Sequence, residues 1–409
     1  MARRLAKRGF RIRRGPKEVP EGGFEGGHWK QAVEAIAQSS FTSNDTFRIL
    51  KEGKTAFDAL FEGIERAERR IALEFYIFRD DETGWALADL LSRKAHQGVK
   101  VYLIYDHFGS RGTSVRFWRF LRDSGVMVRA FRPWEWRRPG RYLHRDHRKL
   151  VIIDGKAAFT GGFNIGDEYR GYWRKKIAGW RDTGACMEGP IAAAMWGPFE
   201  RSWRECGGAK IGRGWMEQAP PAAERGDGLQ MIPLFSSSRA SMRALQRVLH
   251  WSILSARKSI YITVAYFIPP RRILQLLSRA ARRGVEVKLI LPGESDLKFT
   301  SLASRVFYPR LLQEGVELFH YRPGILHAKT MVFDGCWAIL GSANLDARSF
   351  HYNYECGVGI LDRGVGGEMT RMFQEDLKES VAVTAEETHR YPLWERAVGR
   401  MLLRFRSHL

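Results

Sequence analysis

The chain has 409 residues, more than one ordinary hydrophobic core accommodates, and this length predicts two domains. Hydrophobic residues make up 44 % of the sequence, which excludes wholesale disorder. The formal net charge is +22, so we expect a polyanionic partner, either nucleic acid or an anionic lipid surface.

Residues 1–40 are predicted to form a basic N-terminal arm that opens with MARRLAKRGFRIRRGPKEVP. This stretch lacks the apolar core of a secretory signal, so we expect no signal peptide. It is either a disordered arm or an electrostatic anchor, in which each basic residue near an anionic surface contributes about 1 kcal/mol. No run of 18 or more apolar residues occurs in the chain, so we expect no membrane-spanning helix.

Residues 41–215 are predicted to form a first α/β lobe, because strand patterns alternate there with helical ones. After a strand in RRIALEFYIF, further strands are expected at Val99–Asp106 and Val126–Phe131. Gly98 and Gly125 each stand between a helical pattern and a β-branched run, which is typical of a helix C-cap before a buried strand. Such alternation predicts a parallel or mixed sheet flanked by helices.

The same order returns in residues 216–385, which are predicted to form a second lobe. Gly284 follows Gly98 by 186 positions, and Gly315 follows Gly125 by 190. We therefore predict an internal duplication of one α/β unit. A stretch rich in Gly, Pro and Ala at about 207–228 reads as the linker between the lobes, and residues 386–409 read as a basic amphipathic C-terminal helix.

Each lobe carries one copy of a polar motif with the same spacing. In the first, His147, Lys149 and Asp154 are followed after six residues by Gly161-Gly162-Phe163-Asn164. In the second, His327, Lys329 and Asp334 are followed after six residues by Gly341-Ser342-Ala343-Asn344. One such match is weak, but two matches at equivalent places of a duplicated unit point to a single function.

Phosphate chemistry fits these residue types. Histidine and lysine two positions apart in a strand point to one face. Histidine can attack phosphorus or protonate a leaving alcohol, and lysine can hold phosphate oxygens. An asparagine amide adds a donor, while glycine or serine lets the backbone come close. The predicted catalytic residues are His147, Lys149, Asp154, His327, Lys329 and Asp334, and the predicted substrate-binding residues are Gly162, Asn164, Ser342 and Asn344.

We expect no metal and no cofactor, because the lysines supply the charge compensation. Asp182 and Glu355, which lie downstream of the two motifs at the start of small-residue strands, are either carboxylates that orient the histidines or ordinary surface acids. The four cysteines form no CxxC pair and no zinc-type cluster, so we interpret them as buried thiols of a reduced cytoplasmic protein.

The paired motifs resemble those of the phospholipase D superfamily. Surrounding stretches such as LEFYIFRDDETG, RDTGACMEGP and GSANLDARSF are similar to bacterial cardiolipin synthases, notably their short form without transmembrane helices. The resemblance extends from about Asp45 to Leu377. It implies two lobes related by a pseudo-twofold axis, with one shared active site and a phosphohistidine intermediate. By the family pattern His147 is the nucleophile and His327 the acid and base, although the motifs themselves are symmetric.

The resemblance therefore implies a phosphatidyltransferase. Its donor would be a glycerophospholipid, first of all phosphatidylglycerol, and its acceptor a lipid or glycerol hydroxyl. The alternative is a metal-independent nuclease or phosphodiesterase of the same superfamily, because a net charge of +22 also suits nucleic acid.

Two segments favour lipid. The loop of residues 132–141 interleaves Trp134 and Trp136 with arginines, as an interfacial anchor does, although nucleic-acid-binding loops share this composition. In residues 393–406 apolar residues recur at helical spacing beside arginines, which suits a helix in the membrane interface or one docked on its own domain. We predict an anionic phospholipid surface as partner and a peripheral location on the cytoplasmic side of the bacterial inner membrane. No protein partner can be inferred.

Overall fold

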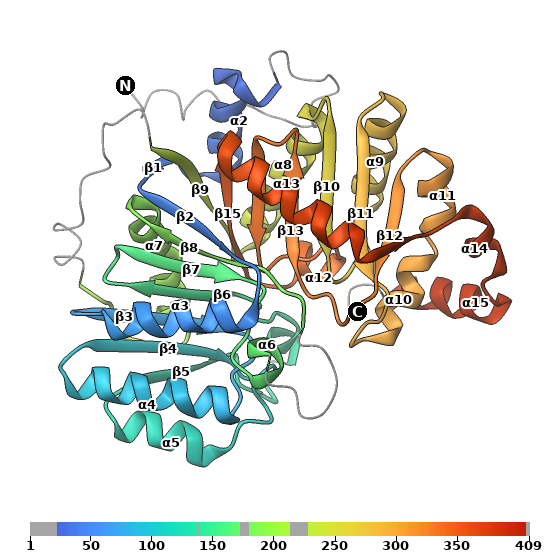
Figure 1. Cartoon of the computed structure of the whole chain (residues 1–409). Helices are drawn as coiled ribbons and strands as arrows, with labels where there is room; N and C mark the ends of the chain where they lie inside the picture. The colour runs from blue at the N-terminus through green and yellow to red at the C-terminus, as the bar shows by residue number, and fades with distance from the viewer. Residues whose placement is uncertain (1–22, 138, 172–179, 213–227, 406–409) are drawn as a thin grey trace.

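The computed structural model describes residues 23–137, 139–171, 180–212 and 228–405, and it consists of two lobes that lie side by side (Figure 1). The first lobe contains a seven-stranded sheet in the order β2-β8-β7-β6-β3-β4-β5. Strands β3, β4 and β5 are parallel, and every other neighbouring pair is antiparallel. In that order the strands are β2 (Thr46–Leu50), β8 (Gly184–Glu188), β7 (Ala157–Gly161), β6 (Lys149–Ile153), β3 (Arg70–Phe75), β4 (Lys100–Asp106) and β5 (Met127–Phe131).

The second lobe repeats this arrangement. Its sheet has the order β1-β9-β15-β14-β13-β10-β11-β12-β16, so seven central strands match the first sheet one by one, with one added at each edge. The predicted fold class, a duplicated α/β unit with a mixed sheet in each half, is confirmed. The strands are β1 (Thr42–Asn44), β9 (Leu229–Ser236), β15 (Glu355–Leu361), β14 (Trp337–Gly341), β13 (Lys329–Phe333), β10 (Ser259–Val264), β11 (Glu286–Pro292), β12 (Glu317–Tyr321) and β16 (Ser380–Ala382).

Helices cover the outer faces of both sheets and fill the space between them. Three buried clusters result, one outside each sheet and one between the sheets. The outer helices of the first lobe are α3 (Gly53–Glu65), α4 (Glu82–His96) and α5 (Val115–Asp123). Those of the second lobe are α2 (Gly27–Ala37), α8 (Arg239–Ser255) and α9 (Arg271–Arg282). Helices α7 (Pro190–Glu205) and α13 (Arg363–Lys378) contribute to the cluster between the sheets.

Shorter helical segments occupy the loops and the C-terminal end. They are η1 (Gly23–Glu25), η2 (Pro139–Leu143), α6 (Asp167–Arg170), α10 (Lys298–Arg305), α11 (Tyr308–Gln313), α12 (Ala347–His351), α14 (Ala385–Arg390), α15 (Leu393–Leu402) and η4 (Leu403–Phe405). No helix among the described residues combines the length and apolar character needed to cross a bilayer.

The four glycines that revealed the duplication adopt the backbone conformation that the sequence predicts. Their φ angles are +89° at Gly98, +87° at Gly125, +85° at Gly284 and +84° at Gly315. Each therefore ends a helix in the left-handed region, which glycine enters without steric cost, and the buried strand begins directly afterwards.

Near the N-terminus, the structure differs from the predicted division into a basic arm (1–40) and a first lobe (41–215). Helix α2 lies in the range that we assigned to a basic arm, yet Trp29 is only 1 % exposed and packs edge-on against Trp337 at 4.9 Å. Strand β1, which follows, pairs with β9 in the second sheet rather than with the first lobe. Burial of apolar side chains thus attaches residues 23–44 to the second lobe. Residues 1–22 and most of the expected linker, 213–227, lie outside the described residues.

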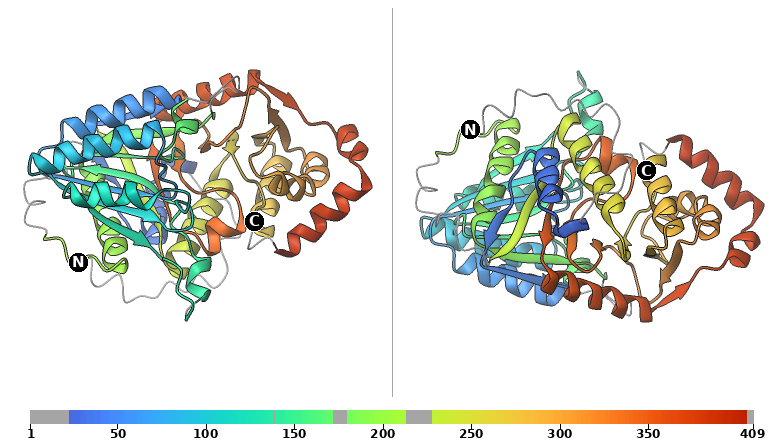
Figure 2. Two further views of the ribbon diagram at one scale, coloured as in Figure 1. Left: turned by 90° about the horizontal axis from the view of Figure 1, so that it is seen from below. Right: turned by 90° about the horizontal axis from the view of Figure 1, so that it is seen from above.

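The C-terminal end forms two helices rather than one. Helices α14 and α15 project beyond the far side of the second lobe (Figure 2). Gly399 rests so closely on Leu302 that an added Cβ atom would lie 2.5 Å from that carbonyl oxygen. Glu395 also binds Arg305 at 2.7 Å. Helix α15 is therefore docked on its own lobe, one of the two alternatives that its sequence allows.

Candidate active site

The two histidines lie where the lobes meet. Each stands two residues before its strand, β6 or β13, and is tied by its backbone to the opposite lobe. The N–H of His147 donates to the carbonyl oxygen of Tyr354 at 2.9 Å, and that of His327 donates to the carbonyl oxygen of Arg181 at 2.8 Å. These two backbone hydrogen bonds therefore hold His147 and His327 at the boundary between the lobes.

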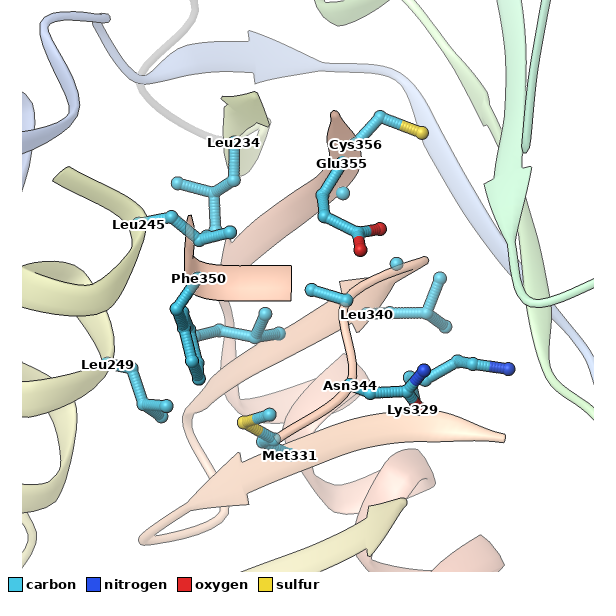
Figure 3. Close-up of a pocket in the computed structure, with 14 residues that line it drawn as sticks. Leu234, Leu245, Leu249, Lys329, Met331, Leu340, Asn344, Phe350, Glu355 and Cys356 are labelled. Atoms are coloured by element: carbon cyan, nitrogen blue, oxygen red, sulfur yellow. The ribbon is translucent and has the colours of Figure 1, made fainter. Parts of the chain in front are cut away.

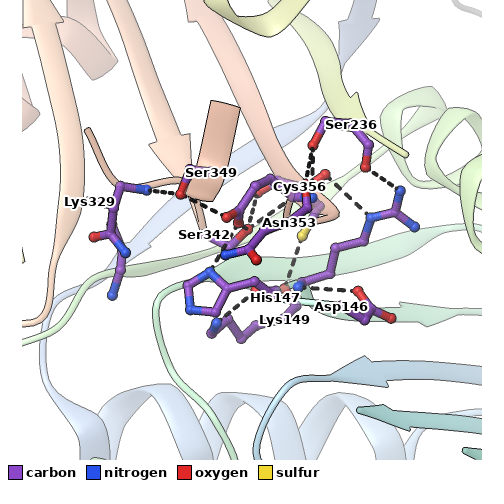
Figure 4. A network of polar contacts seen from close by, with 12 residues as sticks. Asp146, His147, Lys149, Ser236, Lys329, Ser342, Ser349, Asn353 and Cys356 are labelled. Atoms are coloured by element: carbon purple, nitrogen blue, oxygen red, sulfur yellow. Dashed lines mark hydrogen bonds and ion pairs between the residues drawn. The ribbon is translucent and has the colours of Figure 1, made fainter. Parts of the chain in front are cut away.

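Each histidine is hydrogen-bonded to an acid from the other lobe. Nδ1–H of His147 donates to Glu355 Oε2 at 3.1 Å, and Nδ1–H of His327 donates to Asp182 Oδ2 at 2.6 Å. Figure 4 shows His147 within the network around Ser342 and Ser349. Both acids named from the sequence thus contact a histidine, but the pairs are exchanged between lobes, which local sequence does not indicate. With Nδ1 protonated, Nε2 of each ring carries the free lone pair.

Burial sets the protonation of these pairs. It lowers the pKa of His147 to about 4, with Lys149 adding to the effect, and it also lowers the pKa of His327. Burial alone would raise the pKa of Glu355, but His147 and Lys149 outweigh it and lower that pKa to about 2. At neutral pH each pair is therefore a neutral imidazole held by a carboxylate.

The two lysines place positive charge in a poorly solvated region. Burial, followed by the charge of Lys329, lowers the pKa of Lys149 to about 7, and burial lowers that of Lys329 to about 8. Lys149 Nζ donates to the carbonyl oxygen of His147 at 2.7 Å, while Lys329 Nζ lies 2.8 Å from Nδ1 of His327. The charge of Lys329 also lowers the pKa of His147, so the two motifs share one electrostatic environment. An anion between the lysines would stabilise their charged forms.

Apolar walls surround the lysine stems. Figure 3 shows Lys329 beside a cavity that Met331, Leu340 and Phe350 help to line. The cavity measures about 30 Å³, and its counterpart beside Lys149 about 40 Å³. Such volumes hold no more than a few water molecules, so neither cavity has room for an acyl chain. The burial that lowers the pKa of both lysines therefore comes from the packed protein around them.

Asp154 and Asp334 require a correction, because the structure places both away from the site. Each ends its strand and adopts a positive φ, +51° and +52°. Three successive backbone N–H groups, those of residues 68–70 for Asp154 and 257–259 for Asp334, donate to the carboxylate at 2.7–2.9 Å. At 3.3–3.4 Å per residue, seven residues of extended chain separate each Asp from its histidine by about 20 Å. These carboxylates organise a turn, so the predicted catalytic role was wrong.

The two asparagines that we predicted to bind substrate differ in their hydrogen bonds to the rest of the protein. Asn164 is occupied by the protein, since its Oδ1 accepts from the N–H of Ile77 at 3.1 Å and its Nδ2 donates to Tyr169 at 2.8 Å. The Oδ1 atom of Asn344 is buried and has no hydrogen-bond partner among the described residues. Asn344 therefore differs from Asn164 in that the described residues leave its side-chain oxygen without a partner, and its substrate-binding role stays a prediction.

Gly162 and Ser342 contact the orienting acids. A Cβ atom at Gly162 would lie 1.9 Å from Asp182 Oδ1, so only glycine lets that carboxylate approach its histidine. At the equivalent place the hydroxyl of Ser342 donates to Glu355 Oε2. The two positions thus contact the acids that orient the histidines, and their predicted contact with substrate stays a prediction.

Comparison with known proteins identifies the family. A model described as "Cardiolipin synthase, PLD-like domain" matches residues 60–172 and 249–377. A cardiolipin synthase A of Pseudomonas putida is 33 % identical over 381 residues, which cover 91 % of this chain and 77 % of that protein. The chain belongs to the phospholipase D-type cardiolipin synthases. This membership confirms the predicted family and the predicted phosphatidyltransferase class.

Further relatives agree with this assignment. Cardiolipin synthase 2 of Bacillus anthracis is 35 % identical, with 86 % of this chain and 68 % of that protein covered. Among solved structures, phosphatidylserine synthase of Haemophilus influenzae superposes with a TM-score of 0.70 at 15 % identity, covering 93 % of this chain and 98 % of the other. A polyphosphate kinase of Porphyromonas gingivalis reaches 0.58 at 13 % identity, covering 96 % and 57 %. At such identities the two structures support the fold alone.

Sequence reasoning missed two buried arginines of this synthase that join its lobes. Arg148, between the histidine and lysine of the first motif, is fully buried. In the first lobe it donates to Glu74 at 3.0 Å and Ser202 at 2.6 Å. In the second lobe it donates to the carbonyl oxygens of Ser236 at 2.8 Å and Glu355 at 3.3 Å. Strand alternation indicates that this side chain points away from the site, but not that it crosses to the other lobe.

Arg181 plays the same part for the other histidine. It immediately precedes Asp182 and forms a bidentate ion pair with Asp376 of helix α13, at 2.9 and 2.6 Å. Its remaining nitrogen donates to the carbonyl oxygen of Asp182 and to Thr183 Oγ1. Each His–acid pair therefore has an arginine next to one of its members that fastens the two lobes. The signal in the sequence was an Arg adjacent to a candidate acid.

Aromatic rings surround the two histidines unequally. The ring of Tyr76 lies 5.1 Å from that of His147. Tyr169, Trp180 and Tyr266 lie 5.6, 5.2 and 6.4 Å from the ring of His327. His327 is thus the more enclosed of the two, and the lobes, although similar in fold, present different surroundings to a bound phosphate.

Proposed function

We propose that this synthase transfers a phosphatidyl group from a glycerophospholipid, phosphatidylglycerol in the first instance, to a hydroxyl of a second lipid or of glycerol. The reaction proceeds through a phosphohistidine. The proposal is supported by two imidazoles, each oriented by the other lobe's acid, and by two buried lysines, one of which, Lys329, acts electrostatically on His147 and Lys149 of the other lobe.

His147 is the nucleophile in this scheme. With Nδ1–H held by Glu355 and a pKa of about 4, it is neutral and its Nε2 lone pair is free to attack phosphorus. A bond forms between Nε2 and phosphorus while the bond from phosphorus to the leaving alcohol breaks. Lys149 and Lys329 hold the nonbridging oxygens, whose negative charge they offset where water is largely excluded.

His327 is the acid and then the base. Arrival of the phosphate anion raises the affinity of this imidazole for a proton, and the carboxylate of Asp182 stabilises the imidazolium. His327 gives that proton to the leaving alkoxide. It then takes the proton from the acceptor hydroxyl, whose oxygen attacks phosphorus and expels His147. At the end of the cycle His147 is free again and His327 carries a proton again, and no net oxidation or reduction occurs.

The test uses purified protein and phosphatidylglycerol labelled in its phosphatidyl group, in mixed micelles. Label should appear in a product with two phosphatidyl groups, and rapid acid quenching should trap it on His147. His147→Ala should form neither species, while His327→Ala should slow both steps. If the label were trapped on His327 instead, the roles of the two histidines would be reversed. If the wild type, like His147→Ala, formed no product with two phosphatidyl groups, the proposed function would be refuted.

We further propose that the enzyme works as a peripheral protein on an anionic membrane surface, on the cytoplasmic side of the inner membrane. Trp134 and Trp136 are 58 % and 74 % exposed, and Leu297 and Phe299 of the second lobe are 46 % and 61 % exposed. Large exposed apolar side chains on a strongly basic protein suit an interface of anionic lipid. Co-sedimentation with vesicles of phosphatidylglycerol but not of phosphatidylcholine, weakened in Trp134→Ala/Trp136→Ala, tests the surface.

Localisation needs a separate measurement. Protease added to intact cells and to inverted membrane vesicles should cleave the protein only in the latter. Cleavage in cells whose outer barrier alone has been opened would contradict the cytoplasmic side.

A further inference from the structure

A third and larger cavity, of about 290 Å³, lies next to the elements that carry the His147–Glu355 pair. Its polar lining consists of His144, Arg239, Arg243, His351 and Tyr352, and no carboxylate lines it. None of the four residues that handle the reacting phosphorus lines it either. The cavity is therefore a separate concave site with positive character.

The two arginines of this cavity, Arg239 and Arg243, carry its positive charge. Within the described part of the chain, no carboxylate forms an ion pair with Arg239 or Arg243. Both belong to the start of α8, a 17-residue helix whose N-terminal end adds a positive field. Burial, followed by the charges of Arg132 and Arg239, lowers the pKa of His144 despite its bond to Tyr352. An anion would relieve this repulsion.

The cavity is close to the chemistry. His144 precedes His147 by three residues, so their Cα atoms lie within about 11 Å of each other. Helix α12 connects the other side, since Ser349 donates to Glu355 Oε1 at 2.8 Å while Phe350 and His351, next in the chain, line the cavity. An occupant would thus lie beside the nucleophile without occupying its place.

We propose that this cavity binds a second phosphate group, that of the glycerophospholipid whose hydroxyl accepts the phosphatidyl group. The inference rests on the proposed function and deepens it, because joining two anionic lipids requires holding two phosphates at once. Two guanidinium groups suit a phosphodiester, to which they donate charge-assisted hydrogen bonds. Water and glycerol carry no phosphate, so they gain nothing from the cavity.

The experiment measures how the phosphohistidine divides between acceptors. Phosphatidylglycerol labelled in its phosphatidyl group reacts in mixed micelles with glycerol that carries a second, different label. Three products are quantified: the lipid with two phosphatidyl groups, regenerated phosphatidylglycerol, which carries both labels, and phosphatidic acid. All three arise from one intermediate, so their ratio reports the acceptor step independently of donor binding. In Arg239→Gln/Arg243→Gln the share of the two-phosphatidyl product should fall about 10- to 100-fold relative to phosphatidic acid.

A matched control removes the same charge elsewhere. Arg271 and Arg310 are exposed and line a cavity of about 350 Å³ on α9 and α11 that contains no histidine. Arg271→Gln/Arg310→Gln should leave the product ratio within about twofold of wild type, since no positioned phosphate contact is lost. Thermal melts of both variants verify that each is folded.

The outcomes are distinct. An unchanged ratio in Arg239→Gln/Arg243→Gln, or an equal fall in both variants, overturns the inference. Absence of any transfer by wild type refutes the proposed function first, and this inference with it. Inorganic phosphate added to wild type identifies the source of the ligand: suppression of the two-phosphatidyl product shows that free phosphate also fits, and no suppression shows that the site requires a lipid-borne phosphate.

Discussion

Replacing Asp334 by Asn separates the structural role of this aspartate from the catalytic role that its motif suggests. Asn tolerates the positive φ of +52° and keeps the shape of the side chain, but it removes the charge that three backbone N–H groups of residues 257–259 contact. Hydrogen bonds to a charged group contribute about 1.5–3 kcal/mol each when intact. Since the turn is partly solvated and Asn retains one acceptor, we expect a loss of about 1–3 kcal/mol.

Catalysis should hardly change. A unit charge about 20 Å from His327 contributes only about 0.2–0.4 kcal/mol at an effective dielectric constant between 40 and 80, which is less than a twofold effect on rate. We therefore expect Asp334→Asn to melt about 2–10 °C below wild type, yet to keep kcat within about threefold at 25 °C. Melting followed by circular dichroism and transfer from labelled phosphatidylglycerol measure the two quantities.

Asp182→Asn is the matched comparison, because it makes the same chemical change at a carboxylate bonded to His327. It should reduce kcat by about 10³–10⁴, as loss of an orienting acid does in other histidine-centred sites. If Asp334→Asn stayed folded with a melting temperature near wild type but lost more than about 100-fold in kcat, our assignment of a purely structural role would be refuted.

Three further outcomes follow from the contacts at the lobe interface. Glu355→Gln should slow phosphohistidine formation by about 10³-fold or more in single-turnover quench experiments, and trapping at the wild-type rate would contradict an orienting role. Arg148→Lys keeps the charge but cannot reach four acceptors, so we expect kcat to fall about 10-fold or more with little change in KM; a change in KM alone would argue against positioning. Because the pKa of Glu355 is lowered from 4.5 to about 2, its carboxylate stabilises the fold by on the order of 3 kcal/mol above pH 4.5, and this contribution disappears as pH falls towards 2. The difference in urea stability between wild type and Glu355→Gln should shrink over that range, and a constant difference would be incompatible with it.

The parts that sequence predicted well are those with local causes. Gly98 and Gly284 end helices before buried strands because only glycine accepts the left-handed conformation cheaply. His147 and Lys149 follow the two-residue alternation of an extended chain. The conformation of these glycines and the direction of these side chains depend only on residues a few positions away. When the same glycines and the same His/Lys pair occur twice in the chain, they therefore indicate a duplicated lobe and a paired site.

Asp154 shows where a motif misleads. Its constant spacing from His147 suggested a shared task in the site, but the spacing equals the length of strand β6 plus a turn. The carboxylate is held there by three backbone N–H groups at the far end of the strand. A fixed interval in sequence can therefore reflect the architecture that carries a site as well as the site itself.

The sequence by itself determined that this protein has two similar α/β lobes, that each supplies a histidine and a lysine, and that Asp182 and Glu355 are the acids to consider. Only the tertiary structure decided that each acid serves the histidine of the other lobe, and that Arg148 and Arg181 fasten those pairs across the interface. The reason is physical. Strand alternation and helix caps are set by adjacent residues, whereas partners some 145–208 positions apart are chosen when two apolar faces bury each other and bring their edges together.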